Sequence, residues 1–102
     1  MVKKILIYWR DIPAQVIVQR GREREKAQLS LRFQEAIDRA AMRAGKGSSD
    51  AYLSEWRREA STIESAAELR QIVEQEISRF EAEFSDDVLL RLIRNHGSAG
   101  EQ

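Results

Sequence analysis

The apolar positions of the chain gather first in two short runs, at residues 5–9 and 16–18. They are rich in Ile, Val, Tyr and Trp, side chains that suit a pleated, buried surface. Pro13 lies between them, and its fixed φ and missing amide hydrogen suit a turn or the first residue of a strand. The pattern predicts a β-hairpin. Its first strand is apolar on both faces and is expected in the centre of a sheet, whereas the second suits an edge.

The apolar period changes after a charged stretch, residues 20–26, that predicts a solvated loop. A 3.6-residue stripe predicts a helix with Ser30 as N-cap and Gly45 just past its end. A second helix is predicted from a capping box at Ser65 and Glu68. Residues 85–87 either cap a further short helix or bend the second one, and residues 95–97 end the apolar pattern. The two stripes are Phe33, Ile37, Ala40, Ala41 and Ala44, then Leu69, Val73, Ile77, Phe80 and Phe84.

Residues 51–59 fit two patterns. As a strand they place Tyr52, Ser54 and Trp56 on one face, and as a helix capped by Ser49 they form an apolar stripe. The strand is favoured, because a lone two-stranded hairpin is marginal in water and a third strand completes a viable sheet. A strand–helix–strand crossover links parallel strands, so this third strand is expected parallel to the second, on the other side of the first.

The predicted fold is therefore an α+β two-layer sandwich of order β-β-α-β-α(α). Its three-stranded sheet has the order 2-1-3, with the helices on one face. At 102 residues the chain is too short for two cores, so residues 1–97 are expected to form one domain and 98–102 a polar tail without structure.

Composition excludes several kinds of site. The absence of cysteine removes disulfides, thiolate chemistry and cysteine-ligated metals, and the single histidine leaves no cluster for a transition metal, so no metal and no cofactor is expected. No apolar run approaches the roughly 20 residues that span a membrane, and a cytoplasmic location is expected.

The net charge of zero hides an imbalance between the two halves of the chain. Residues 1–50 carry eleven Lys or Arg and six Asp or Glu, a balance of +5. Residues 51–102 carry six and eleven, a balance of −5. Either half could attract an oppositely charged partner. The favoured interpretation is that the halves pair with each other or keep the protein dissolved.

The candidate catalytic groups are weak. Asp11 and Glu55 are the carboxylates nearest to aromatic residues, but a turn-forming Asp and an exposed Glu are the favoured interpretation. His96 is expected at a helix C-terminus, where a cation suits the dipole. Residues 45–49 lack the spacing of a phosphate loop. The chain is therefore predicted not to be an enzyme, with an enzyme of unrecognised motif as one alternative.

The best candidate for a binding surface is a set of aromatic residues and arginines with two polar neighbours, expected near one end of the sheet. Such a surface is typical of protein interfaces and of platforms for single-stranded nucleic acid. The favoured interpretation is that both tryptophans belong to the core, followed by a protein interface; the neutral net charge disfavours nucleic acid. The set comprises Tyr8, Trp9, Arg10, Asp11, Gln15, Tyr52, Trp56, Arg57 and Arg58.

Three segments, residues 8–16, 32–42 and 52–58, resemble a small bacterial family named the "virulence factor" domain, most specifically in the run Tyr-Trp-Arg-Asp-Ile-Pro at 8–13. Its members stand alone or are joined to HEAT-like repeats, and the stand-alone ones are often encoded near cobalamin- or folate-dependent methyl-transfer enzymes. The resemblance implies no catalytic residues. The chain is predicted to be an interaction module that binds a larger cytosolic enzyme or scaffold through the surface of tryptophans and arginines. The resemblance implies an accessory role in a one-carbon methyl-transfer system. A small nucleic-acid-binding protein is the main alternative, no membrane partner is expected, and self-association through an edge strand is plausible.

Overall fold

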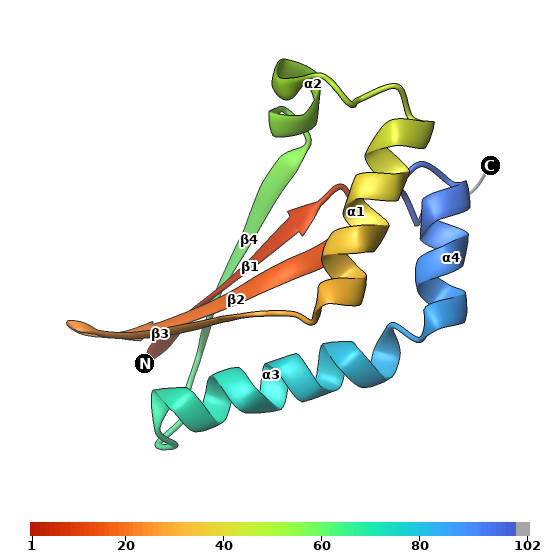
Figure 1. The fold of residues 1–102 in the computed structure, drawn as a ribbon. Coiled ribbons are helices and arrows are strands. Elements are labelled where there is room, and N and C mark those ends of the chain that lie inside the picture. The colour runs from red at the N-terminus through yellow and green to blue at the C-terminus, as the bar shows by residue number, and fades with distance from the viewer. Residues whose placement is uncertain (100–102) are drawn as a thin grey trace.

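A computed structural model describes residues 1–99 as one four-stranded antiparallel sheet and four helices (Figure 1). The predicted α+β class is confirmed, but the sheet has four strands instead of three. The strands are β1 (Val2–Trp9), β2 (Ile12–Arg20), β3 (Glu23–Gln28) and β4 (Trp56–Ile63), in the order β3-β2-β1-β4. The helices are α1 (Leu31–Arg43), α2 (Ser49–Leu53), α3 (Leu69–Glu83) and α4 (Asp86–Arg94).

The predicted hairpin is formed by β1 and β2, with β1 in the interior of the sheet. The prediction of β2 as an edge strand was wrong, because β3 pairs along its outer side from Gln15↔Gln28 to Arg20↔Glu23. The predicted loop at 20–26 is instead a tight turn and most of this edge strand. Charged side chains are tolerated there, because an edge strand leaves them in water.

Residues 51–59 are neither all strand nor all helix. They contain the end of α2, a turn, and the start of β4, so the preference for a strand throughout was wrong. The predicted direction and position of this strand are confirmed, since β4 runs antiparallel to β1 from Trp9↔Trp56 to Val2↔Ile63 and is therefore parallel to β2, on the other side of β1. The connection differs from the predicted single crossover. The unpredicted β3 first returns the chain to the end of the sheet where β1 finishes, and β4 enters from that end.

The helix boundaries follow the predicted signals in part. Ser30 and Ser85 are the N-caps of α1 and α4, and Gly45 follows the Ala44 C-cap of α1 with a φ of +72°. The Ser85 hydroxyl accepts a hydrogen bond from the Val88 amide, as capping requires. The capping box predicted at 65–68 is absent, because α3 starts at Leu69 without a side-chain cap.

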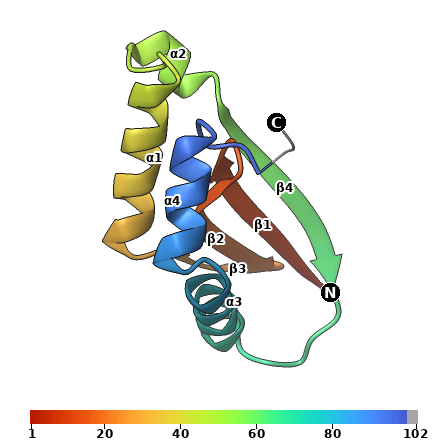
Figure 2. The ribbon, with the colours of Figure 1, turned by 90° about the vertical axis from the view of Figure 1, so that its right-hand side faces the viewer.

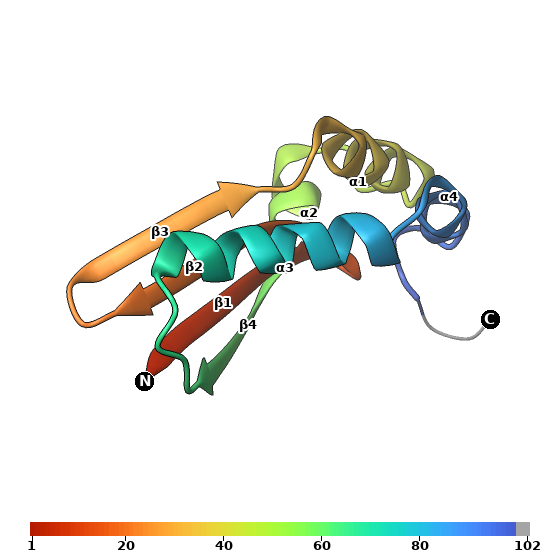
Figure 3. The same ribbon diagram turned by 90° about the horizontal axis from the view of Figure 1, so that it is seen from below.

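The helices α1, α3 and α4 lie on one side of the sheet, while α2 sits at the end where β1 finishes (Figure 2). Seen from below, α3 runs along β2 and β3, and α1 and α4 lie side by side beyond it (Figure 3). The core fills the space between these layers. Its largest fully buried members include Trp9, Phe33, Ile12, Ile37, Val2, Val16 and Val18.

The last described residues are fixed to the hairpin. The Ala99 amide donates to the Asp11 carboxylate at 2.6 Å, and the Asp11 amide donates to the Gly97 carbonyl oxygen at 2.8 Å. The remainder of the predicted tail, residues 100–102, lies outside the described residues. Within residues 1–99, none of the helices has both the length and the apolar character needed to cross a membrane.

Candidate binding surface

Trp9 is a core residue at the end of β1, fully buried. Its indole Nε1 donates to the Tyr52 carbonyl oxygen at 2.9 Å, and its ring stacks on that of Tyr52 with centroids 5.9 Å apart. Gly97 closes the other side, where a Cβ would lie only 2.8 Å from Trp9 Cζ3. Trp9, a member of the run Tyr-Trp-Arg-Asp-Ile-Pro, therefore holds three segments together and is not available to a partner.

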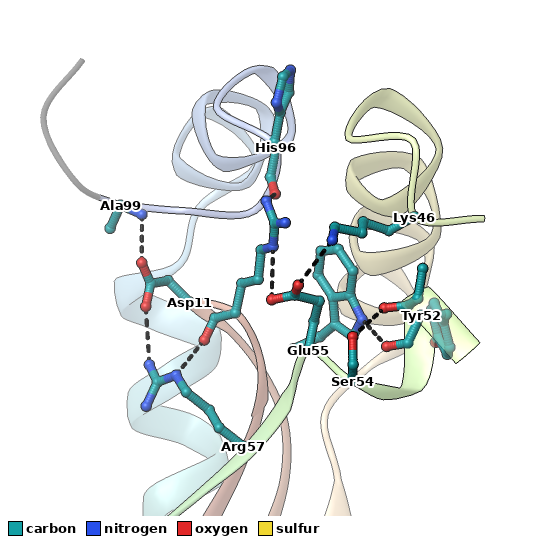
Figure 4. Close-up of polar contacts among 11 residues, drawn as sticks. Asp11, Lys46, Tyr52, Ser54, Glu55, Arg57, His96 and Ala99 are labelled. Atoms are coloured by element: carbon teal, nitrogen blue, oxygen red, sulfur yellow. Dashed lines mark hydrogen bonds and ion pairs between the residues drawn. The ribbon is translucent and has the colours of Figure 1, made fainter. Parts of the chain in front are cut away.

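Hydrogen bonds join four residues around the β1–β2 turn, Arg10, Asp11, Glu55 and Arg57, here called the turn cluster. Figure 4 labels Asp11, Glu55 and Arg57 of this cluster. Arg10, at a φ of 54°, donates from Nε to the Glu55 carboxylate at 3.2 Å and from a terminal nitrogen to the His96 carbonyl oxygen at 2.9 Å. Arg57 donates to the Arg10 carbonyl oxygen at 2.6 Å and to the Asp11 carboxylate at 3.0 Å. The cluster thus joins the hairpin, the start of β4 and the end of the chain.

The carboxylates of the turn cluster are already engaged by cations. The hydrogen bond from Arg10 holds the pKa of Glu55 below its ordinary value, and Lys46, 3.4 Å away, acts in the same direction. Burial opposes the charged form of Arg57, but hydrogen bonds to Glu59 and Asp11 outweigh it and raise the pKa of the guanidinium. Two carboxylates paired in this way suit a structural role better than proton transfer.

The nine candidate residues are divided between two faces of the sheet. Tyr8 and Arg57 are opposite each other on the side of the helices, where the guanidinium carbon lies 4.3 Å from the Tyr8 ring centroid. Gln15, Trp56 and Arg58 belong to the other side, since side chains alternate along each strand. The residues around Trp9 and the turn cluster therefore converge, whereas Gln15 and Arg58 lie with Trp56 on the side of the sheet opposite to Tyr8 and Arg57.

The side of the sheet turned away from α3, here called the open face, is built from three cross-strand rows. Pairing aligns Ile17 and Ile5 at its centre, and these two side chains are only 5% and 4% exposed. The rows, from β3 to β4, are Gln28–Gln15–Ile7–Arg58, Lys26–Ile17–Ile5–Ala60 and Arg24–Gln19–Lys3–Thr62. The outer positions are exposed, so a narrow apolar centre lies between polar margins.

The open face carries cations without any carboxylate among its described residues. Lys3, Arg24, Lys26 and Arg58 are all exposed, and none of them makes an ion pair within residues 1–99. The acidic neighbours on the same strands, such as Glu25 and Glu59, point to the side of the helices by the same alternation. The face therefore attracts anionic groups despite the neutral net charge.

The chain matches the model of the family described as Virulence factor over residues 7–93. It belongs to that family. The match includes the turn cluster and all of the open face except its Lys3 and Ile5 positions. No curated protein and no solved structure matches the chain.

Sequence reasoning about this virulence factor family member missed Lys3, Arg24 and Lys26. The last two lie in the stretch interpreted as a loop. Their signal was the alternation Glu23, Arg24, Glu25, Lys26, which places acids and bases on opposite faces once the stretch is a strand. No apolar residue lies among these four positions to reveal the two-residue period of a strand, so the stretch was predicted to be a charged loop.

Proposed function

We propose that this virulence factor family member is a non-enzymatic interaction module that binds a larger protein through the open face of its sheet. One observation carries the proposal: four exposed cations lie on an uncovered sheet face with no carboxylate beside them among residues 1–99. Like charges gathered on one face repel one another, and an oppositely charged partner relieves that repulsion when it binds. An acidic surface is the complement that such a face fits.

The open face is the better choice of binding surface because the charged groups of the turn cluster are already bound within the chain. The arginines of the turn cluster are used by backbone carbonyl oxygens and carboxylates of the same chain, and Trp9 is buried. The open face thus offers the unpaired charge. Cytosolic enzymes of cobalamin- or folate-dependent methyl transfer, which the family resemblance suggests as neighbours, are the first partners to test.

The test is a tagged pull-down from the native cytosol with nuclease present, followed by mass spectrometry. The double variant Lys26→Glu/Arg58→Glu should lose a stoichiometric protein partner that the wild type retains. The matched control is Arg39→Glu/Arg91→Glu, which changes the charge equally at two exposed helix positions away from the open face. Equal retention by all three proteins would remove the open face as the binding surface.

A second candidate function is nucleic-acid binding. The observation that favours it is that the part of the chain the structure describes places no carboxylate on the open face. Phosphate contacts by lysine and arginine supply much of nucleic-acid affinity, which then falls steeply with salt. This function predicts that the material captured by the wild type disappears on nuclease treatment. A nuclease-resistant protein partner decides for the first function instead.

A further inference from the structure

A hollow of about 440 Å³ lies between the open face and the start of α1. Ile7, Gln15, Gln28 and Trp56 line it from the sheet, while Phe33 and Gln34 line it from the first turns of α1. Its volume is in the range of small-molecule sites. Because it opens at the end of the open face, a bound molecule would reach the neighbouring cations.

The polar groups of this pocket are three neutral amides. Gln34 donates to the Asp38 carboxylate at 3.0 Å and to the Tyr52 hydroxyl at 3.3 Å, which leaves its carbonyl oxygen as an acceptor. The side-chain amides of Gln15 and Gln28 have no hydrogen-bond partner within residues 1–99. Amides of this kind pair with heterocycle edges that carry a donor beside an acceptor, as nucleobases do.

Nucleotide recognition also needs an aromatic surface for stacking and a cation for the phosphate. The pocket has Trp56 in its wall and Arg58 and Lys26 beside it. Trp56 is half-buried and fixed edge-on against Tyr52, with centroids 5.9 Å apart and planes at 84°, so the indole is held in place for stacking. Arg58 lies two residues further along the same strand, opposite the pocket residue Ile7. Lys26 lies two residues from Gln28 on β3, so a cation flanks the pocket on each side.

We propose that this pocket binds a nucleotide, with the base against Trp56 and the glutamine amides and the phosphate at Arg58. The neutral lining selects an uncharged planar ring, while the adjacent cations select an anionic substituent. This inference goes beyond the proposed function, because a protein partner on the open face needs no nucleotide. The two can therefore fail separately.

The first experiment titrates the purified full chain with AMP, GMP, CMP and UMP and with their parent nucleosides by calorimetry. At least one monophosphate should bind, and tighter than its nucleoside. Gln15→Leu should weaken binding about tenfold, because a hydrogen bond to a buried ligand edge is lost. The matched control is Gln19→Leu, on the same strand and face but two rows from the pocket, where binding should be unchanged.

A second pair of variants tests the phosphate site. Arg58→Gln should bring the affinity for the monophosphate down to that for the nucleoside, whereas Arg39→Gln on α1 should leave the difference intact. Trp56→Phe should keep the affinity within about threefold and remove the ligand-induced fluorescence change, because a phenyl ring still stacks. Thermal unfolding of each variant checks that it is folded.

Single-stranded oligonucleotides of eight residues distinguish a free nucleotide from a base within a strand. Much tighter binding of an oligonucleotide, with the same loss in Gln15→Leu, assigns the pocket to a nucleic-acid strand. Tighter binding of a monophosphate assigns it to the free nucleotide. No binding of any of these ligands at millimolar concentration, or equal losses in Gln15→Leu and Gln19→Leu, would overturn the proposal, even if the pull-down recovered a protein partner.

Discussion

At the scale of single residues, the contact between Trp9 and Gly97 packs the segment after α4 against the end of β1. Gly97 has a φ of +92°, a conformation that residues with a Cβ rarely adopt, and it lies against the buried indole. The arrangement joins the first hairpin to the end of α4, two parts of the chain that share no secondary structure. The same contact leaves the Trp9 side chain fully buried, so it stabilises the fold and is not exposed for binding.

We expect Gly97→Ala to lower the free energy of unfolding by roughly 2–4 kcal/mol, the sum of a left-handed backbone penalty and a steric clash with Trp9. Urea denaturation followed by far-UV circular dichroism measures the loss. Gly21→Ala is the control, because Gly21 has a φ of +59° and no atom within 4 Å of an added Cβ. It should cost only about 1–2 kcal/mol, and equal losses for both variants would contradict a tight Trp9 contact.

At the scale of elements, the side chain of Glu81 on α3 fixes the N-terminus of α1 by hydrogen bonds that the N-cap residue Ser30 does not itself supply. The Ser30 side chain makes no capping bond within α1. Instead, Glu81 accepts hydrogen bonds from the Ser30 amide at 2.9 Å, the Ser30 hydroxyl at 3.0 Å and Arg32 at 3.0 Å. Burial acts to raise the pKa of Glu81, but the bonds from Ser30 and Arg32 outweigh it and hold the pKa below its ordinary value.

This lowered pKa gives Glu81→Gln a pH-dependent effect. A carboxyl group with a depressed native pKa stabilises the fold above its unfolded value, about 4.3, and loses that contribution as pH falls through the native pKa. We expect the variant to be less stable by about 1–2 kcal/mol at pH 7, with the difference shrinking below about pH 4. Denaturant titrations across this range measure it.

Glu74→Gln, an exposed change on the same helix, is the control for Glu81→Gln and should have little effect at either pH. A Glu81 effect that stayed constant down to the acid limit would mean that the side chain acts through packing and not through its charge. The test therefore separates the inter-helix bond from the general tolerance of α3 to substitution.

The elements also show where local sequence signals were sufficient. The hairpin, α1 and the Ser85 cap of α4 follow from apolar period, glycine and capping residues that act within a few positions. The strand β3 does not, because long-range pairing with β2 decides it. The candidate site divides in the same way: the meeting of Trp9, Tyr52 and Arg57 could be anticipated, but the open face required β3.

At the scale of the whole molecule, a net charge of zero conceals two sides of opposite sign. The open face holds Lys3, Arg24, Lys26 and Arg58, whereas exposed carboxylates such as Glu74 and Asp87 lie on the helices. Charges within about 10 Å of each other act together at 0.1 M salt. A partner approaching the open face therefore meets a cationic surface, whatever the average charge.

This separation predicts that the wild type is retained on a heparin resin at pH 7.5 and low salt, although its sequence pI is about 6.6. Lys26→Glu/Arg58→Glu should elute without salt. The double variant Arg39→Glu/Arg91→Glu, with the same net charge, should still bind, and the salt concentration at elution is the measured quantity. If the two double variants eluted together, net charge would govern retention and the open face would have no special role. Separate elution would identify the open face as the surface that binds the anionic resin.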